Sequence, residues 1–536
     1  MTTMNNSVRR PNILLIQVDQ MAAAALPIYG HKLVKTPHLS ALAERSVVFD
    51  TAYCNSPICA PSRYSMLTGR LPSAIGAFDN ASELPAANPT LAHYLRSLGY
   101  SATLSGKMHF VGPDQMHGYE ERLTTDIYPS DFSWTPNWLE GPTNKPTGIS
   151  MASVVDAGIC ARSLQIDYDE EVAFHAMQKL YDLARGTDAK PFFLTVSFTH
   201  PHSPFTALQE YWDLYAHDQI DMPAVGAIPL DEMDEQSRWL YYSHGRDLHT
   251  ISEADVRNAR HAYYGMISYI DDRIGQLLGV LERLGLDENT VIVFTSDHGE
   301  MLGERGMWYK QTFFEWSSRV PLMICHPGKL EPQRVSQAVS LVDLLPTLLD
   351  MATDGAPPAL ASEIDGRSLV GLMHGADRQG RDLAISEYSD MGVCAPCRML
   401  RRGRYKYIYT HGHPALLFDL DADPHELTNL SGDARVRAVE RELEQEILRG
   451  WDPQAIHRQV LDSQRRRLFI QRVTQTSPSF DNWTLEVRKG DRHRYVRAGT
   501  GGSTNTKARA RFPFVQGRKP DRAPTGDAGA APENAG

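Results

Sequence analysis

The chain has 536 residues, of which 42% are hydrophobic and 22% charged, and this balance is typical of a globular protein and excludes a largely disordered one. The formal net charge of -11 argues against nucleic acid or an acidic membrane as a partner. Six cysteines are too few for a disulfide scaffold, and no apolar run has the length of a membrane-spanning helix or a signal-peptide core. We therefore expect a soluble, cytoplasmic protein.

Short apolar runs bounded by turn residues recur along the chain and predict buried strands. They are NILLIQV (12–18), FFLTVSF (192–198), TVIVFTS (290–296) and PLMICHP (321–327). Residues 259–285 carry Ile267, Ile270, Ile274 and Leu281 at spacings of three and four, which predicts a long helix. Strands alternating with helices indicate an α/β fold, with a large, mostly parallel sheet flanked by helices.

The pattern changes after a polar, glycine-rich stretch at 363–381. Close-set strands are predicted in APCRMLRRG (395–403), YKYIYTHG (405–412) and ALLFDLDADP (415–424), followed by a helix at 433–449. We expect a catalytic domain at 1–375, a smaller C-terminal antiparallel-sheet α+β domain at 376–455 and an extended tail at 456–536. The last 20 residues or so are rich in Gly, Ala, Pro and charge and are expected to be disordered.

Cys394 and Cys397 form a lone C-x-x-C pair. Such a pair can serve a redox reaction or supply half of a metal site, but the sequence holds no second pair to complete one. We favour two structural thiols in a strand region.

Acidic and amide side chains follow two of the predicted strands. Asp19 and Gln20 follow NILLIQV, while Asp297 and His298 follow TVIVFTS. Ligands collect at the carboxyl ends of parallel strands, and these residue types can bind a hard divalent cation. Taken singly, such residues more often cap helices or make turns, and only their combination favours a metal site.

Three further stretches bring proton carriers and cationic side chains to the same sheet edge. They contain Lys107 with His109, His200 with His202, and Lys310 after MWY. Lone histidines and lysines are commonly structural or solvated. Together with a cation, however, they suit the binding of a tetrahedral oxyanion.

Cys59 stands in SPICAPSRYSMLTGR without a cysteine or histidine at the spacing of a zinc site. The apolar residues that follow and then Gly69 predict a short helix with a glycine stop. Cys59 is therefore expected near a helix N-terminus, where anions bind.

The stretch from Cys59 to Arg63 matches C-x-P-S-R, the signature of sulfatases. The motifs VDQ, SGKMH, HSP, SDHGE and the lysine after MWY also occur, in the order found in that family, between about Pro11 and Leu430. The sequence resembles the sulfatase family, and within it the bacterial choline-sulfatase branch, through GAFDNASELPA, SGKMHFVGPDQMHGYEERLTTDIYPSDFSWTPNW, SEYSDMGV and RRGRYKYIYTHG. This resemblance implies an alkaline-phosphatase-like fold.

The resemblance also implies the nucleophile. A maturation enzyme would oxidise Cys59 to formylglycine (3-oxoalanine), whose hydrated form, a geminal diol, attacks the sulfur atom. Arg63 would hold the diol, while Asn80 and Lys107 would bind sulfate oxygens. A serine at this position would lack the second hydroxyl and would remain trapped as its sulfate ester.

Proton transfers are implied for three residues. His202, aided by Lys310, would protonate the leaving alcohol. His109 would deprotonate the second hydroxyl of the diol, so that sulfate leaves and the aldehyde is restored.

The cation implied by the resemblance is divalent, with calcium preferred over manganese or magnesium. Gln20 and His298 stand where many sulfatases have aspartate and asparagine, as in the choline-sulfatase and phosphonate-monoester-hydrolase branch. The resemblance further implies a homo-oligomer such as a tetramer. The expected ligands are Asp19, Gln20, Cys59, Asp297 and His298.

Choline O-sulfate is the expected substrate. Its quaternary ammonium requires an aromatic face or a carboxylate. Trp134 and Trp138, with Tyr128 nearby, could supply the face and Glu387 the charge, and of these we favour Trp134 and Glu387. In the tail, Arg509–Pro513 resembles the closing stretch of choline sulfatases, but Thr504 and Asn505 stand where that family carries acids.

Three other functions stay open from the sequence. The chain could act on another alkyl or aryl sulfate, or on a phosphonate monoester or phosphodiester, because sulfur and phosphorus oxyanions are both tetrahedral. It could also bind sulfate esters without turnover, with an intact Cys59 thiol.

Overall fold

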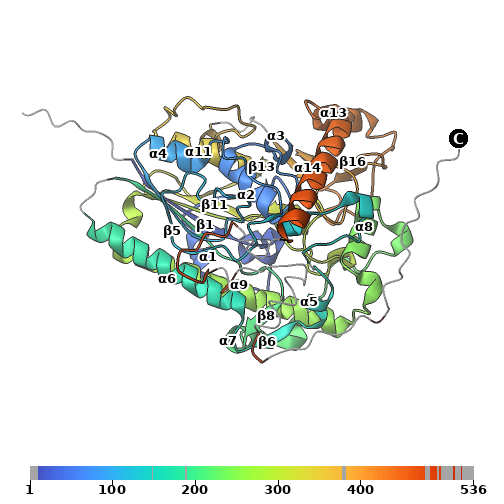
Figure 1. The fold of residues 1–536 in the computed structure, drawn as a ribbon, viewed down its shortest axis with the longest axis horizontal. Helices are drawn as coiled ribbons and strands as arrows, with labels where there is room; N and C mark the ends of the chain where they lie inside the picture. The colour runs from blue at the N-terminus through green and yellow to red at the C-terminus, as the bar shows by residue number, and fades with distance from the viewer. Residues whose placement is uncertain are drawn as a thin grey trace, which may run out of the picture.

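A computed structural model describes residues 10–147, 149–186, 190–376, 382–476, 483–491, 494–495, 511–513 and 521, and an eight-stranded sheet forms its centre (Figure 1). The strand order is β12-β2-β11-β9-β1-β7-β4-β5. The bounds of these strands are β1 (Asn12–Val18), β2 (Val47–Phe49), β4 (Ser101–Gly106), β5 (Glu121–Arg122), β7 (Phe192–Ser197), β9 (Thr290–Ser296), β11 (Leu322–Cys325) and β12 (Gln333–Val335).

The sheet is mostly parallel, as predicted. β1 is parallel to both of its neighbours, β7 and β9, and β7 is parallel to β4. β11, predicted from PLMICHP, is the exception because it runs antiparallel to both β9 and β2. An apolar run does not encode strand direction, so the sequence could not show this.

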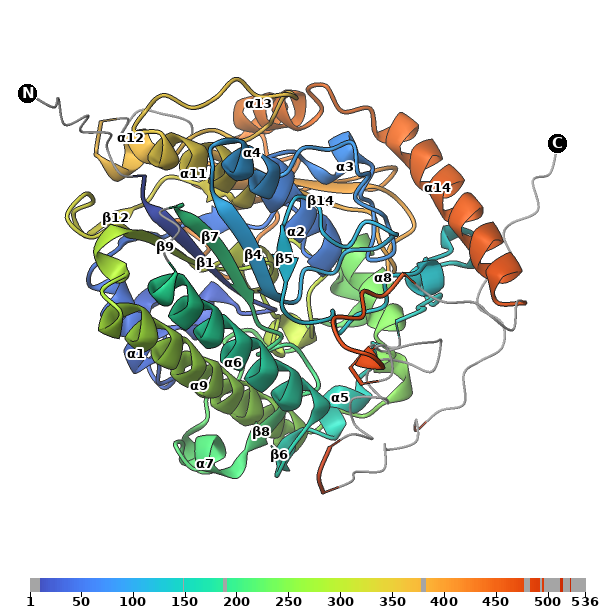
Figure 2. The same cartoon turned by 60° about the vertical axis from the view of Figure 1, so that its left-hand side comes forward.

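Helices cover both faces of this sheet (Figure 2). α6 and α9 pack with α1 over the face that carries Leu14 and Ile16 of β1, whereas α2, α4 and α11 pack over the face that carries Ile13 and Leu15. The prediction of a helix at 259–285 is confirmed by α9. The helices are α1 (Pro37–Ala43), α2 (Cys59–Thr68), α3 (Pro72–Ile75), α4 (Leu91–Ser97), α5 (Ala152–Val155), α6 (Leu164–Arg185), α7 (Gln209–Trp212), α8 (Glu235–Ser243), α9 (Glu253–Arg283), α10 (Glu315–Ser318), α11 (Leu344–Ala352), α12 (Val370–Met373), α13 (Arg437–Ile447) and α14 (Pro453–Thr474).

A separate antiparallel sheet lies beyond the main one, in the order β14-β15-β16-β17. α13 packs on it through a small apolar cluster that includes Leu400, Leu417, Leu443 and Ile447. The buried Lys406 of β16 ties this sheet to the rest of the molecule, because its ammonium donates to the Phe313 carbonyl at 2.8 Å. The strands are β14 (Leu383–Tyr388), β15 (Cys397–Arg402), β16 (Tyr405–Thr410) and β17 (Leu416–Asp419). Elsewhere, β10 (Arg319–Val320), β3 (Ala52–Tyr53) and β13 (Val339–Ser340) form a short three-stranded sheet, and β6 (Gly158–Cys160) pairs with β8 (Thr206–Leu208).

The region predicted as a tail begins inside a long helix. Residues 456–474 belong to α14, which runs from the side of α13 along the outer edge of the molecule (Figure 2) and contacts the turn at 132–134. The buried side chains Ile456, Val460 and Gln464 recur every four residues, whereas most of the helix surface is polar. Farther on, Arg511 donates to the Asp156 carbonyl at 2.6 Å. Thr504, Asn505 and the last 20 residues or so lie outside the described residues.

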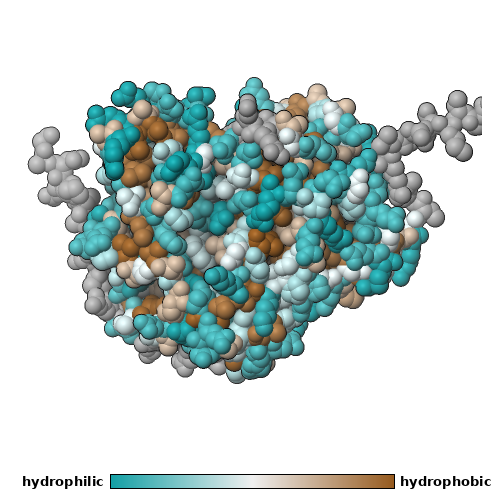
Figure 3. Space-filling model, turned by 180° about the vertical axis from the view of Figure 1, so that it is seen from behind, coloured by the Kyte–Doolittle hydropathy of each residue, from teal (hydrophilic) through white to brown (hydrophobic). Residues whose placement is uncertain are grey.

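Hydrophilic residues cover much of the face seen in Figure 3, with apolar residues in smaller groups between them. Among the residues that the structure describes, no helix is both long and apolar enough to cross a membrane.

Candidate active site

The candidate site lies at the carboxyl ends of β1 and β9, where two carboxylates meet. The strands are adjacent and parallel with Val18 opposite Ser296, so Asp19 and Asp297 leave the sheet side by side. The Asp297 amide donates to the Val18 carbonyl at 3.3 Å, and both aspartates are fully buried. The structure therefore brings together the two strand ends at which the sequence predicted ligands.

Cys59 and His298 complete a compact group of potential metal-binding atoms. One donor atom from each of Asp19, Cys59, Asp297 and His298 lies within 4.8 Å of the others. The Cys59 sulfur is 3.2 Å from His298 Nε2 and 3.8 Å from Oδ1 of Asp19. His298 Nδ1 donates to the Gly299 carbonyl at 3.0 Å, and burial lowers the pKa of His298 to about 4. The neutral Nε2 therefore directs a lone pair toward the group.

Gln20 adds an amide beside this group. Its backbone N–H donates to Oδ1 of Asp297 at 3.1 Å, with Gln20 in the left-handed region at φ 68°. Its side-chain NH₂ donates to Glu300, and its carbonyl oxygen accepts from Lys310. Two buried carboxylates, an imidazole nitrogen and an amide oxygen are a donor set that fits a divalent cation.

Cys59 is the first residue of α2, in agreement with the predicted short helix. No side chain caps this helix at its N-cap residue, and the N–H of Ala60 instead donates to Oδ1 of Asn80 at 2.9 Å. Gly69, at φ 68°, ends the helix. Asn80 is thereby held against Ala60, the residue that follows Cys59.

Two buried ammonium groups stand beside the Cys59 thiol. Lys107 forms an ion pair with Asp19, and the nitrogen of Lys310 lies 2.7 Å from Nε2 of His202. Burial and the Asp19 carboxylate raise the pKa of the Cys59 thiol, Lys107 and Lys310 lower it, and the resulting pKa is below the ordinary value. The site therefore favours negative charge at this position.

His109 reaches the site from the loop after β4. Asp126 holds this loop by accepting from the backbone N–H groups of Met108 and His109 at 3.0 and 2.7 Å. The imidazole stacks on Tyr128 with a centroid distance of 4.6 Å and meets the edge of Trp134 at 5.6 Å. Both ring nitrogens are buried without a hydrogen-bond partner, and burial lowers the pKa of His109. A neutral imidazole with such nitrogens is suited to accept a proton.

The loop after β7 carries two histidines with different environments. His202 Nδ1 donates to the Ser203 carbonyl at 2.6 Å, so its Nε2 is the nitrogen that faces Lys310. His200 Nδ1 instead lies 2.7 Å from the buried carboxylate of Asp169. Of the two histidines, the resemblance favoured His202 as the acid, and it is His202 that lies beside Lys310, whereas His200 contacts Asp169.

Arg63 lies one helical turn after Cys59 and is fully buried. Its Nε donates to Asp297 at 2.8 Å, and its Nη1 donates to the Lys107 carbonyl and the Ser197 hydroxyl, each at 2.8 Å. Its Nη2 has no hydrogen-bond partner and lies 3.7 Å from Asp19. One nitrogen of the guanidinium, with its two N–H groups, thus remains for a ligand, while the other two nitrogens join the strand ends.

Glu387, expected to attract the ammonium of choline, does not lie with this group. Its carboxylate accepts from the Ser73 N–H at 2.8 Å and hydroxyl at 3.0 Å and lies 3.2 Å from Arg398. An ion pair within the protein thus already satisfies this charge, and the contact of Glu387 with an ammonium stays a prediction. Trp138 also has a structural contact, since its indole N–H donates to the Asp390 carbonyl at 3.0 Å.

Cys394 and Cys397 are free thiols. Burial raises the pKa of Cys394 to about 11 and that of Cys397 to about 12, so neither thiol is activated. Within the described part of the chain, neither belongs to a group that could hold a metal ion.

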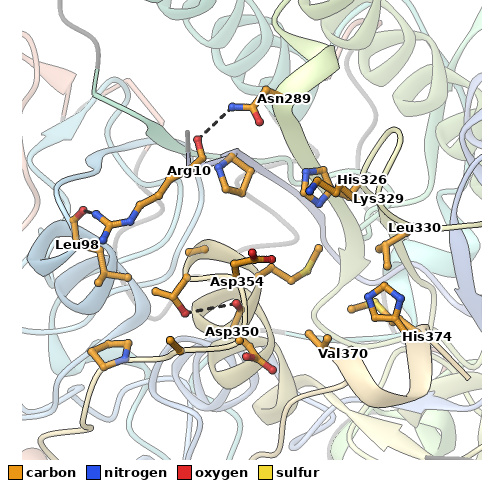
Figure 4. A pocket seen from close by; sticks show the side chains of 18 residues that line it. Arg10, Leu98, Asn289, His326, Lys329, Leu330, Asp350, Asp354, Val370 and His374 are labelled. Atoms are coloured by element: carbon orange, nitrogen blue, oxygen red, sulfur yellow. Dashed lines mark hydrogen bonds between the residues drawn. The ribbon is translucent and has the colours of Figure 1, made fainter. Parts of the chain in front are cut away.

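A cavity of about 530 Å³ lies at the opposite edge of the main sheet (Figure 4). Arg10 and Asn289 precede β1 and β9, whereas His326 follows the antiparallel β11, so all three mark the amino ends of the parallel strands. The Asn289 amide donates to the Arg10 carbonyl at 3.1 Å. This cavity is therefore separate from the candidate active site.

Three further side chains support the site, of which the sequence indicated Glu300 only as part of the strand end SDHGE and did not indicate Asp126 or Asp169. Each accepts backbone hydrogen bonds from a loop that carries a site residue. Glu300 stands within SDHGE, but Asp126 and Asp169 have no motif that separates them from surface acids.

The family comparisons agree with this geometry. The model of the Sulfatase family matches residues 11–354, and that of the N-sulphoglucosamine sulphohydrolase C-terminal region matches residues 303–451. Choline-sulfatase of Rhizobium meliloti is 42% identical over 495 residues, which cover 91% of this chain and 96% of that protein. Arylsulfatase of Clostridium perfringens is 30% identical over 448 residues, covering 78% of this chain and 90% of its own.

A solved structure extends the comparison to the fold. Phosphonate monoester hydrolase of Agrobacterium radiobacter has a TM-score of 0.65 and 28% identity, covering 84% of this chain and 96% of that chain. The fold, the grouping of strand-end ligands around Cys59 and these matches show that the chain belongs to the sulfatase family, within the alkaline-phosphatase-like superfamily, and is a sulfuric ester hydrolase.

Proposed function

We propose that the protein hydrolyses a small alkyl sulfate ester, with choline O-sulfate as the first candidate, after a maturation enzyme has oxidised Cys59 to formylglycine. The observation that carries this proposal is the position of Cys59, whose sulfur lies 3.2 Å from His298 Nε2 within the group of metal-binding side chains. Oxidation would place an oxygen nucleophile where the thiol now stands. The 42% identity to a choline-sulfatase supports the choice of substrate.

The residues proposed to hold a divalent cation are Asp19, Gln20, Asp297 and His298, together with the matured residue 59. Oxygen donors dominate this set, so calcium is the first choice, and manganese or magnesium are alternatives. A bound cation would offset the negative charge of the two carboxylates and of the sulfate group.

Lys107 and Asn80 are proposed to bind the sulfate oxygens. The Lys107 ammonium is fully buried beside Asp19, and Asn80 contacts the first turn of α2 through Ala60. A buried ammonium stabilises developing negative charge more strongly than an exposed one because water does not screen it. Arg63 Nη2, which lacks a hydrogen-bond partner, is proposed to orient the nucleophile.

His202 and Lys310 are proposed to protonate the leaving alcohol. The ammonium of Lys310 lies 2.7 Å from His202 Nε2, so the pair shares a proton that the imidazole can pass to an oxygen. His109, with two unpartnered nitrogens, is proposed to accept the proton that must leave when sulfate is released. The two histidines thus divide the acid and base steps.

Trp134 remains the proposed aromatic contact for the quaternary ammonium. It is buried against His109 and Tyr128. The nitrogen of Lys107 lies 3.8 Å from the centre of the Tyr128 ring, so that ring already has a cation as a neighbour. We omit Glu387 from this contact because it pairs with Arg398.

A phosphonate monoester or phosphodiester is the second candidate substrate, and the similarity to phosphonate monoester hydrolase supports it. Steady-state kinetics of the matured protein with choline O-sulfate, 4-nitrophenyl sulfate and a phenyl phosphonate ester distinguish the candidates. We expect the largest kcat/KM for choline O-sulfate. A larger kcat/KM for the phosphonate than for choline O-sulfate would overturn the proposal of a sulfate substrate. A larger kcat/KM for the aryl sulfate would overturn the proposal of choline O-sulfate.

A protein that binds sulfate esters without turnover would keep its Cys59 thiol. Mass spectrometry of the peptide that contains Cys59, after co-expression with a formylglycine-generating enzyme, is expected to show a loss of about 18 Da. An unmodified thiol in a protein without activity would support the binding function instead. We also propose a homo-oligomer, which the molar mass in solution tests.

A further inference from the structure

Two polar side chains of α6 hold the loop that carries His202. Gln165 and Asp169 are four residues apart, so they lie on the same face of the helix. α6 runs alongside β4 and β7 (Figure 2), and this face meets the loop at the end of β7. Gln165 is 3% exposed and Asp169 is 0% exposed, although both types of residue are usually found at the surface.

The Asp169 carboxylate accepts four hydrogen bonds from this loop. Oδ1 accepts from the Thr199 N–H at 2.8 Å and its hydroxyl at 3.0 Å. Oδ2 accepts from the His200 N–H at 2.9 Å and from His200 Nδ1 at 2.7 Å. A buried carboxylate with this many donors holds its partners firmly, because an unpaired one would carry a large desolvation cost.

Gln165 holds the same loop from its carbonyl side. Its NH₂ group donates to the carbonyls of Thr199 at 3.1 Å and His202 at 2.7 Å. The His202 N–H donates to the Thr199 carbonyl at 2.9 Å, so the backbone on both sides of His202 is fixed. The loop is also joined to the metal-binding strand, since the Asp19 N–H donates to the His200 carbonyl at 3.3 Å.

We infer that Gln165 and Asp169 are positioning residues for the protonation of the leaving group, acting through His202. They fix the loop so that His202 Nε2 faces Lys310 and the reacting oxygen. This inference rests on the proposed function, because it assigns His202 the role of acid. The hydrogen bonds of both side chains go to Thr199, His200 and His202 of this loop, so a change in either is expected to affect the acid step selectively.

The test compares two sulfate esters that differ in their need for an acid. 4-Nitrophenolate is a weak base and can leave without being protonated. The alkoxide of an alkyl sulfate is a strong base and needs a proton from an acid as it leaves. In Asp169→Asn and in Gln165→Met we expect kcat/KM for the alkyl sulfate to fall about 100-fold, within the range of general acid catalysis, and kcat/KM for 4-nitrophenyl sulfate to fall less than about 3-fold. His202→Ala is expected to show the same selectivity. The double variant His202→Ala, Asp169→Asn is expected to lose no more kcat/KM than His202→Ala alone.

Asp182→Asn is the matched control, because Asp182 lies near the far end of α6, where its exposed carboxylate pairs with Arg185. It is expected to change neither substrate's kcat/KM. Equal losses for both esters in the Asp169 and Gln165 variants, or independent losses in the double variant, would overturn the positioning role. If an unaltered, matured protein hydrolyses no ester, the proposed function fails.

Hydrogen–deuterium exchange tests the contacts without substrate. We expect faster exchange in peptides that contain Thr199 to Ser203 for both variants, and unchanged exchange for Asp182→Asn. Gln165→Met keeps the buried carboxylate of Asp169, so this variant can still be measured if Asp169→Asn does not fold. Unchanged exchange of this loop in the folded Gln165 variant would contradict the inference even if no activity is found.

Discussion

Cys59 lies between two carboxylates and two ammonium groups. These surrounding charges indicate the chemistry of residue 59 better than the identity of the cysteine does. Asp19 and Asp297 raise the pKa of the thiol, while Lys107 and Lys310 lower it. The same charges would position a cation and a sulfate group around an oxygen at this residue. Glu387 shows the opposite case, because its motif indicated a substrate contact but its carboxylate has Arg398 as a partner.

Glu387→Gln and Trp134→Ala test the two predicted contacts with choline. We expect Trp134→Ala to raise KM for choline O-sulfate about 10-fold more than KM for 4-nitrophenyl sulfate, since it removes an aromatic face for the ammonium. Glu387→Gln is expected to change KM for choline O-sulfate and KM for 4-nitrophenyl sulfate by the same factor, because the carboxylate pairs with Arg398. It should also lower the free energy of unfolding by about 1 to 3 kcal/mol through loss of the charge that pairs with Arg398. A selective effect of Glu387→Gln would return this residue to the substrate site.

The loops after β4 and β7 are held in the same way, by a buried aspartate that accepts backbone hydrogen bonds. Asp126 accepts from two successive backbone N–H groups, those of Met108 and His109, and Asp169 does so for Thr199 and His200. Each loop delivers one of the two proposed proton carriers, His109 or His202. The strands therefore bring each loop to the site, and a buried aspartate fixes the backbone next to the histidine.

α14 is tied to the site region by a buried ion pair. Arg467 donates to both oxygens of Asp79, at 2.7 and 2.6 Å, one residue before Asn80. Burial and the nearby Asp79 raise the pKa of Asp390 well above its usual value, so Arg467 is the cation beside two buried carboxyl groups. This contact connects the C-terminal helix with the sulfate-binding residue proposed above.

Arg467→Met is expected to lower the free energy of unfolding by about 3 to 5 kcal/mol, because it leaves Asp79 buried without its partner. Thermal or denaturant unfolding measures this change. Arg465→Met is the control on the same helix, since Arg465 is exposed and pairs with the exposed Asp462, and it should cost less than about 1 kcal/mol. Recovery of stability in the double variant Arg467→Met, Asp79→Asn is expected, and equal losses for Arg465→Met and Arg467→Met would contradict this account.

At the scale of the molecule, the site lies where two apolar cores meet at one sheet edge. One core contains α6 and α9, the other α2, α4 and α11, with β1 contributing alternate residues to each. Burying the two aspartates at the ends of β1 and β9 is costly, and the ion pairs of Asp297 with Arg63 and of Asp19 with Lys107 offset part of this cost, which a bound cation would reduce further. The fold and the proposed cation should therefore depend on each other.

Removal of divalent cations is expected to lower Tm, and added calcium is expected to restore it. Saturation at about 1,000 times the dissociation constant would stabilise the fold by about 4 kcal/mol. Differential scanning calorimetry before and after chelation measures the shift. Asp19→Asn with Asp297→Asn is the control, since it removes the two carboxylates and should abolish the response, and an unchanged Tm in the unaltered protein would contradict the assignment of these ligands.

The sequence predicted the central strands, α9 and the grouping of strand-end ligands because these follow from apolar periodicity and from where parallel strands end. It could not predict the antiparallel direction of β11, since both directions bury the same residues. It missed α14 as well, whose polar surface leaves only a narrow apolar stripe at Ile456 and Val460. The partners of Asp169 and Glu387 are distant in sequence, so no local pattern indicated them.

The number of sulfate esters cleaved per enzyme molecule tests the central claim, that residue 59 acts as a regenerating aldehyde. Sulfate and alcohol released from the substrate are measured for the matured protein, for Cys59→Ser and for Cys59→Ala. We predict many turnovers for the matured protein, at most one alcohol released per molecule of Cys59→Ser, which cannot regenerate, and none for Cys59→Ala. Repeated turnover by either variant would contradict the account.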